Sequence, residues 1–133
     1  MIDYLRPDLA SELKAISTLG LAHVGDAVFE LMARTWLCAN GALTARQIHG
    51  GTVSIVSAKA QAAAAWKLLV LLDDEELAVF KRGRNAHVSP PRSSTFGEYH
   101  AATALEALFG YLYLLGRVDR LNELFAVVIE GEY

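Results

Sequence analysis

The sequence lacks the features that mark a secreted or membrane-embedded protein. Its 133 residues contain one cysteine, Cys38, so no internal disulfide can form, and a buried thiol in a reducing compartment is the simplest interpretation. No apolar run reaches membrane-spanning length, since the longest candidates are interrupted by Lys67 or confined to residues 107–115. The N-terminal stretch carries acids early and has no apolar segment typical of a signal peptide. These absences predict a cytoplasmic protein without a membrane partner.

Several catalytic and cofactor motifs are also missing. The chain has no strand-like alternation of apolar and polar residues, and therefore no glycine-rich phosphate loop following a strand. It has no HExxH motif and no cluster of cysteines and histidines. The segment Glu98-Tyr99-His100 does not have the Glu-x-x-His spacing of di-iron bundles. These absences exclude the common zinc, di-iron and nucleotide-binding constellations.

The charge is acidic overall but unevenly distributed. A net charge of −3 argues against a general nucleic-acid binder. Residues 31–72 and 77–97, however, contain eight of the twelve lysines and arginines and no acid. Such windows can present a locally basic face to a polyanion, although an ordinary solvated helix surface is the simpler interpretation of any single residue.

Helical signals dominate what is present, and they predict one all-α domain over residues 1–133 with about six or seven helices. Hydrophobic residues make up 53% of the chain, which is enough for a packed core. A loop is predicted over 86–95, because Pro90-Pro91 cannot continue a helix. The expected helices are a short one after Pro7, one capped by Thr18 and ending near Cys38, a short one from Thr44 toward Gly50-Gly51, an alanine-rich one over 54–72, one capped by Asp73 or Asp74, one over 95–115, and a last one after Gly116.

Two carboxylates lie where an ordinary core would not place them. Asp26 lies in LAHVGDAVFELM and Glu106 in ATALEALFGYLYLL, and both stretches read as largely apolar helices. An ionised carboxylate among apolar side chains is costly unless a cation, hydrogen bonds or a substrate compensates it, so the simplest explanation is a shared metal ion. Each acid also has an alternative interpretation without a metal ion. Asp26 could be an ordinary surface aspartate, and Glu106 could pair with an arginine on the protein surface. Gly25 directly precedes Asp26 in its helix, and a glycine there indicates that another backbone approaches this helix closely.

A third element, KRGRNAHV at residues 81–88, combines cations, an amide and a glycine at the end of a helix. Such a segment suits contact with a phosphate backbone. It also suits a helix C-terminus whose cations complement the helix dipole, and both interpretations can hold together.

Taken together, GDAVFE, KRGRNA and ATALEALFGYLYL resemble the catalytic domain of the ribonuclease III family. The resemblance covers roughly residues 15–125 and is strongest to the short form, Mini-ribonuclease III. LAHVGDAVFELMAR is similar to the signature helix, and VSAKAQA, KRGRNA and YHAATALEALFGYLYLL follow in the family's order. As in the short form, no separate double-stranded-RNA-binding domain is expected.

The resemblance implies an all-α endonuclease that cleaves double-stranded RNA with Mg²⁺ as a homodimer. The GD aspartate and the EAL glutamate of the family are metal-associated catalytic residues, and they correspond to Asp26 and Glu106. The implied substrate is a precursor of 23S ribosomal RNA, and a ribosomal-protein helper is left open. The remaining implied site residues are Lys81, Arg82, Arg84 and Asn85 for the RNA backbone and Val24, Val28 and Met32 for the dimer interface.

The sequence departs from full-length ribonuclease III at two carboxylate positions. Ala22 stands four residues before Asp26 where a glutamate is usual, and Thr103 stands three before Glu106 where an aspartate is usual. A sparse, weakly metal-binding site is therefore expected. The alternative is a non-catalytic helical module for RNA binding or ribosome assembly, and a structural helical dimer without RNA affinity is the third interpretation.

Overall fold

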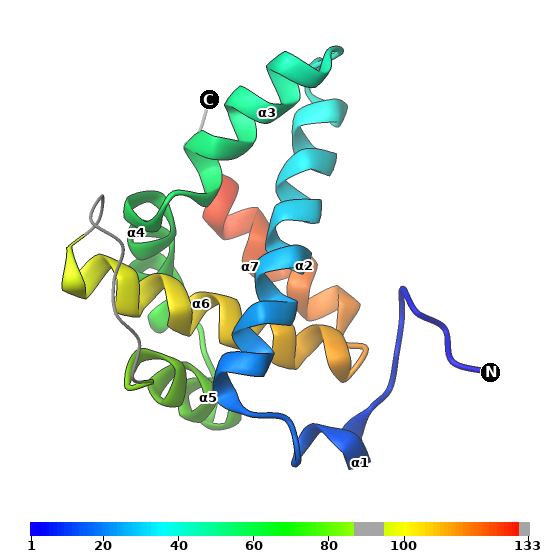
Figure 1. Ribbon diagram of the computed structural model, residues 1–133, viewed down its shortest axis with the longest axis vertical. Helices are drawn as coiled ribbons and strands as arrows, with labels where there is room; N and C mark the ends of the chain where they lie inside the picture. Colours follow the sequence, from blue (N-terminus) through cyan, green and yellow to red (C-terminus); the bar gives the residue numbers. More distant parts are fainter. Residues whose placement is uncertain (87–94, 131–133) are drawn as a thin grey trace.

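The described chain is entirely helical, as predicted. The computed structural model describes residues 1–86 and 95–130, and no strand occurs in these ranges. Seven helices follow one another (Figure 1): α1 Ala10–Leu13, α2 Thr18–Ala39, α3 Ala45–Val56, α4 Ala58–Leu69, α5 Asp74–Arg84, α6 Phe96–Leu114 and α7 Val118–Ile129. Most of the predicted loop, residues 87–94, lies outside the described ranges.

The helix starts are set by side chains that accept hydrogen bonds from free backbone N–H groups. Reciprocal capping boxes begin three helices, with Thr44 and Gln47 at α3, Asp73 and Glu76 at α5, and Thr95 and Glu98 at α6. Ser17, and not Thr18, caps α2, since its hydroxyl accepts from the N–H of Gly20. The predicted start of α2 was therefore wrong by one residue.

The predicted break between the third and fourth helices was also misplaced. Gly50 and Gly51 lie inside α3, which continues to Val56, and the chain then turns at Ser57. Ser57 is extended, ends α3, and caps α4 by accepting from the N–H of Ala60. The single helix predicted over 54–72 is thus the end of α3 and the whole of α4.

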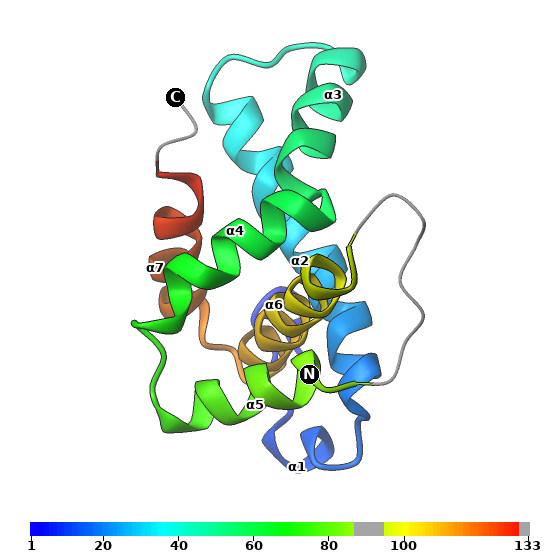
Figure 2. The same cartoon turned by 90° about the vertical axis from the view of Figure 1, so that its left-hand side faces the viewer.

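Helix α6 forms the centre of the molecule. Figure 2 shows it foreshortened, with α2, α4 and α5 around it, and these three helices make its most extensive contacts. Between Ala101 and Leu112, Glu106 is the one residue that is not buried. The core beside α6 contains the edge-to-face aromatic rings of Phe29, Phe109 and Phe125. Because other helices surround α6, they hold Glu106, its one partly exposed residue in this stretch, in a fixed position.

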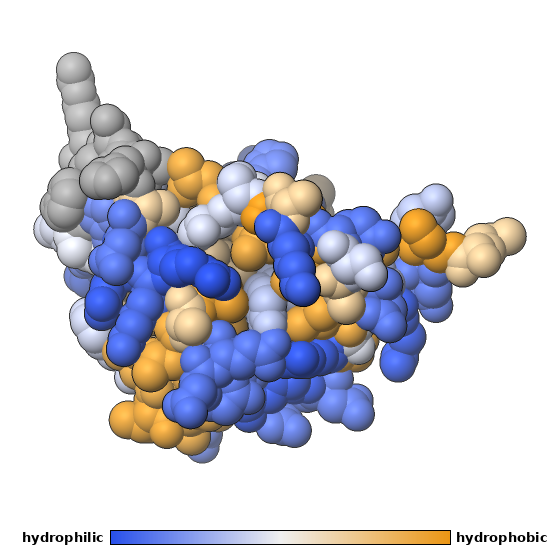
Figure 3. All heavy atoms as spheres, turned by 90° about the horizontal axis from the view of Figure 1, so that it is seen from below, coloured by the Kyte–Doolittle hydropathy of each residue, from blue (hydrophilic) through white to orange (hydrophobic). Residues whose placement is uncertain are grey.

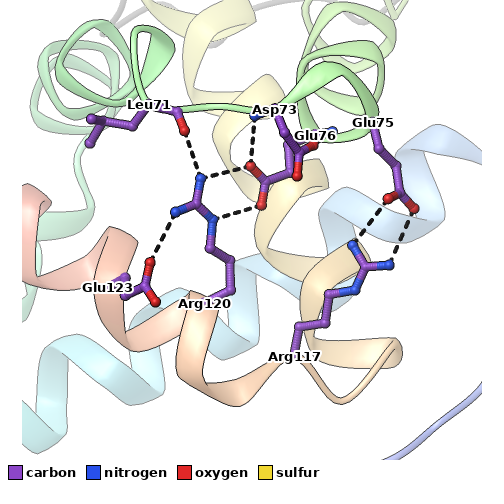
Figure 4. Close-up of polar contacts among 7 residues, drawn as sticks. All are labelled: Leu71, Asp73, Glu75, Glu76, Arg117, Arg120 and Glu123. Atoms are coloured by element: carbon purple, nitrogen blue, oxygen red, sulfur yellow. Dashed lines mark hydrogen bonds and ion pairs between the residues drawn. The ribbon is translucent and has the colours of Figure 1, made fainter.

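A buried ion pair fastens α5 to α7 (Figure 4). Glu76 is 1% exposed, and both its carboxylate oxygens accept hydrogen bonds of 2.8 Å from the guanidinium of Arg120. Arg120 also donates to the carbonyl of Leu71 at 2.7 Å and to Glu123 at 3.0 Å. Burial of this carboxylate is compensated by a fixed cation, so Glu76 is a structural residue.

Two further expectations concern the surface. None of the helices described is long and apolar enough to cross a bilayer. Cys38 is exposed near the end of α2, so the interpretation of a buried thiol was wrong. The last turn of α2 extends beyond the core, so Cys38 is exposed although the sequence around it is apolar.

Candidate active site

Helices α2 and α6 cross with their backbones in contact, and two glycines make this possible. A Cβ atom on Gly25 would lie 1.6 Å from the carbonyl oxygen of Glu106, and one on Gly110 would lie 2.0 Å from that of Leu21. No side chain fits such spaces. The close approach predicted from Gly25 is therefore confirmed, and Gly110 is its counterpart on α6.

The crossing brings Asp26 and Glu106 together. Their carboxyl groups share a hydrogen bond, although the residues lie 80 positions apart in sequence. Asp26 is exposed and Glu106 partly buried, so the pair opens to solvent on the α2 side. We call these two residues the carboxylate pair. The alternative in which Glu106 pairs with an arginine is wrong, while Asp26 does lie on the surface.

The carboxylate pair is electrostatically unfavourable without a cation. Burial raises the pKa of Glu106 to about 8, and the negative charge and hydrogen bond of Asp26 add to this rise. Without a cation, Glu106 therefore retains its proton at neutral pH.

The buried Glu76 and the partly buried Glu106 show opposite behaviour. Hydrogen bonds from Arg120 lower the pKa of Glu76, because a cation faces it. Glu106 faces a second acid in place of a cation, and its pKa rises. A carboxylate with no compensating cation, next to another and open to solvent, is the arrangement expected of a functional site.

Gln61 is the site residue that sequence reasoning missed. It lies on α4, is 2% exposed, and its amide approaches Glu106 closely enough to favour the charged form of that carboxyl group. Its Nε2 nevertheless makes no direct hydrogen bond within the described part of the chain. The motif VSAKAQA contains the residue, but a glutamine in an alanine-rich helix gives no sign that it is buried.

The two positions without family carboxylates offer nothing in their place. Ala22 and Thr103 are both buried, and the Thr103 hydroxyl donates to the carbonyl of Tyr99 in its own helix at 3.0 Å. Within residues 1–86 and 95–130, no group of three or more His, Cys, Asp or Glu side chains could hold a metal ion. Ala22 and Thr103 therefore add no ligand beside Asp26 and Glu106, and the metal site itself stays a prediction.

The end of α5 packs against α6 close to the carboxylate pair. A Cβ on Gly83 would lie 2.7 Å from Cα of Ala104, so this glycine allows close helix packing. His100 Nδ1 lies 2.8 Å from the carbonyl oxygen of Arg84. Glu106 follows six residues later on α6, a rise of about 9 Å. The end of α5 thus packs against the same helix that carries Glu106.

The four residues predicted to contact RNA, Lys81, Arg82, Arg84 and Asn85, are all exposed, and we call them the basic end of α5. Figure 3 shows strongly hydrophilic side chains on the face that includes α1 and α5, interrupted by apolar ones. Arg82 differs from the other three, because it lines a cavity of about 640 Å³ beside α1 and α2. Neither member of the carboxylate pair lines that cavity, so it is separate from the candidate active site. The role of the basic end of α5 in RNA binding stays a prediction.

The residues predicted at the dimer interface form a row along α2. Val24, Val28 and Met32 are each partly buried against the core, and Leu31 beside them is 58% exposed. The row leaves apolar surface open to a partner, and the interface itself stays a prediction.

Comparisons with known proteins agree with this geometry. Residues 19–117 match the Ribonuclease III domain family. The Mini-ribonuclease 3 of Brevibacillus brevis is 41% identical over 132 residues, covering 96% of this chain and 98% of the relative, and that of Clostridium tetani is 37% identical, covering 89% and 80%. A crystal structure of a Fusobacterium nucleatum protein superposes with a TM-score of 0.82 at 34% identity, covering 90% of this chain and 98% of that one.

These matches include both helices of the carboxylate pair and extend over most of each relative. The family acts on RNA and generally depends on a divalent metal ion. The chain belongs to the ribonuclease III family, in its Mini-ribonuclease III branch, and is an endoribonuclease.

Proposed function

We propose that the chain hydrolyses double-stranded RNA with Mg²⁺ held by Asp26 and Glu106, and that it acts on precursors of 23S ribosomal RNA in the cytoplasm. The observation that carries the proposal is the hydrogen-bonded carboxylate pair at the α2–α6 crossing. A binding module would gain nothing from two adjoining acids beside a polyanion, because they repel phosphate. A metal-dependent nuclease needs them.

The residues present fit a magnesium ion. Carboxylate oxygens are its preferred protein ligands, and Mg²⁺ keeps several waters, so two protein carboxylates and a substrate phosphate suffice. The buried Nε2 of Gln61 near Glu106 has no direct partner and is a donor that a water at the site would satisfy. A bound divalent cation supplies Lewis-acid stabilisation of charge on the phosphate and activates the attacking water.

The protein residues have separate tasks in this reaction. Glu106 releases its proton, and Asp26 and Glu106 present carboxylate oxygens on the open side of α6. The basic end of α5 neutralises phosphates flanking the scissile bond, which A-form RNA presents by shape and not by sequence. A homodimer with two such sites, formed along α2, would cut both strands of a duplex.

The test is cleavage of a double-stranded RNA by the purified protein in Mg²⁺. Asp26→Asn and Glu106→Gln are expected to lower the rate at least 100-fold while leaving duplex binding in Ca²⁺ measurable. Glu30→Gln, which alters an exposed carboxylate on the same α2 helix, serves as the matched control and should retain activity. Cleavage that survives both site variants would exclude the carboxylate pair as the active site.

A second measurement tests the basic end of α5. Arg84→Ala should weaken binding similarly for all duplex sequences and reduce the slope of affinity against salt by about one. An unchanged slope would place Arg84 outside the RNA-binding surface. Arg46→Ala, another exposed arginine outside the basic end, is the comparison.

The alternative of a non-catalytic RNA-binding module was raised because Ala22 and Thr103 stand where larger members of the family carry carboxylates. It is disfavoured by the chain's place among endoribonucleases. It predicts duplex binding without Mg²⁺-dependent cleavage, so the same assay separates the two functions.

A further inference from the structure

Gln61 is unusual among the buried polar side chains of the described residues. Four such residues are fully buried: Thr52, Gln61, Glu76 and Thr103. The two threonine hydroxyls donate to carbonyls in their own helices, and Glu76 is held by Arg120. Only the Gln61 amide keeps a donor, Nε2, without a partner. Buried donors are nearly always satisfied, so this one needs a reason.

The surroundings of the Gln61 amide supply one. It interacts with Glu106 and favours the ionised form of that carboxyl group, yet Nε2 makes no direct hydrogen bond to it. A polar contact that is close but not direct is commonly bridged by water. A water between the Gln61 amide and Glu106 would satisfy the donor and fix the orientation of the carboxylate.

The site has a particular need for such a residue. Thr103 and Ala22 supply no carboxylate that could bind the cation or orient its ligands. The Thr103 hydroxyl donates its hydrogen bond to the carbonyl of Tyr99. Gln61 approaches from α4, a third helix, and is held rigidly because its neighbours Ala62, Ala64 and Ala65 are packed in the core. Residues that orient a metal ligand from behind commonly change metal affinity 10-fold or more.

We propose that Gln61 is a positioning residue for the metal site, whose amide orients the Glu106 carboxylate toward Asp26 through a bridging water. The inference rests on the proposed function, since it assumes that the carboxylate pair takes up a divalent cation. It assigns to α4 a role in the reaction that neither carboxylate can perform, namely to fix one ligand before RNA arrives.

The experiment measures Mn²⁺ binding to the full chain without RNA, at pH 7.5, by water-proton relaxation. Gln61→Met keeps the length of the side chain and removes the donor, and is expected to weaken Mn²⁺ binding about 10-fold. Its urea midpoint should be equal to or above that of the wild type, because an unpartnered buried donor is lost. Gln61→Asn, which keeps an amide one methylene shorter, serves if Gln61→Met does not fold, and should also bind Mn²⁺ more weakly.

Thr52→Val is the matched control, because it removes a buried polar group that is satisfied inside α3. Mn²⁺ affinity unchanged in Gln61→Met or Gln61→Asn, whatever happens to the urea midpoint, would show a purely structural residue and overturn the inference alone. Mn²⁺ binding by the wild type that Glu106→Gln does not weaken would overturn the proposed function, and the inference with it.

Discussion

The raised pKa of Glu106 predicts that its neutralisation stabilises the metal-free protein. The folded state holds this proton until the pH reaches about 8, whereas the unfolded chain releases it near the ordinary glutamate pKa of 4.5. The folded state therefore binds more protons between these values, and its stability falls as the pH rises through that window. Glu106→Gln removes the titrating group while keeping the shape of the side chain.

The magnitude follows from the width of the window. A difference of 3.5 pH units, from 4.5 to about 8, corresponds to about 5 kcal/mol at about 1.4 kcal/mol per unit. Solvent on the open side of the pair screens part of this, so we expect Glu106→Gln to raise the free energy of unfolding by about 2–3 kcal/mol at pH 8. At pH 5 the gain should be below about 1 kcal/mol, because Glu106 is protonated in the folded state and still about one quarter protonated in the unfolded chain.

The assay is urea denaturation of both proteins in EDTA, at one protein concentration, at pH 5, 6, 7 and 8. Glu12→Gln, an exposed carboxylate in α1, is the control and should show no such pH-dependent gain. Adding Mg²⁺ at pH 8 should then stabilise the wild type and not Glu106→Gln, since only the wild type retains both ligands. A stability difference that is the same at pH 5 and pH 8 would refute the reasoning.

Three further predictions concern packing and charge. Gly25→Ala should destabilise the protein by about 3 kcal/mol or more in urea denaturation and abolish cleavage, since its Cβ would overlap the α6 backbone, whereas Gly50→Ala, with open space around it in α3, should stabilise by about 1 kcal/mol. Arg120→Met should cost about 3 kcal/mol at pH 7 by leaving the buried Glu76 unpaired. Because the pKa of Glu76 is lowered in the folded protein, that stabilisation exists above about pH 4.5 and disappears as the pH falls below it, so the wild type and the variant should converge in acid. Thr103→Asp should tighten Mn²⁺ binding, measured by relaxation, and destabilise the metal-free protein at pH 8, since it adds a carboxylate to the pair; unchanged affinity would mean that position 103 does not face the cation.

Local chemistry made the helices predictable. Threonine and aspartate caps, the glycine at position 116 and the apolar periodicity each act within a few residues, so the starts of α3, α5 and α6 could be located closely from the sequence. The break at Ser57 was missed because the alanine-rich sequence after it favours helix and no glycine or proline marks the turn, after which α4 packs against α6. Propensity yields to tertiary contacts at such positions.

The sequence by itself determined an all-α chain, its ordered family motifs and two acids out of place in apolar helices. The tertiary structure decided that these acids touch, because the meeting depends on backbone contact between Gly25 and Gly110, residues with no side chain to reveal a partner. It also decided that Glu76 faces a cation, Arg120, whereas Glu106 faces a second acid, Asp26. Gln61 could be found only there, because an unpartnered donor is a property of three-dimensional surroundings and not of residue type.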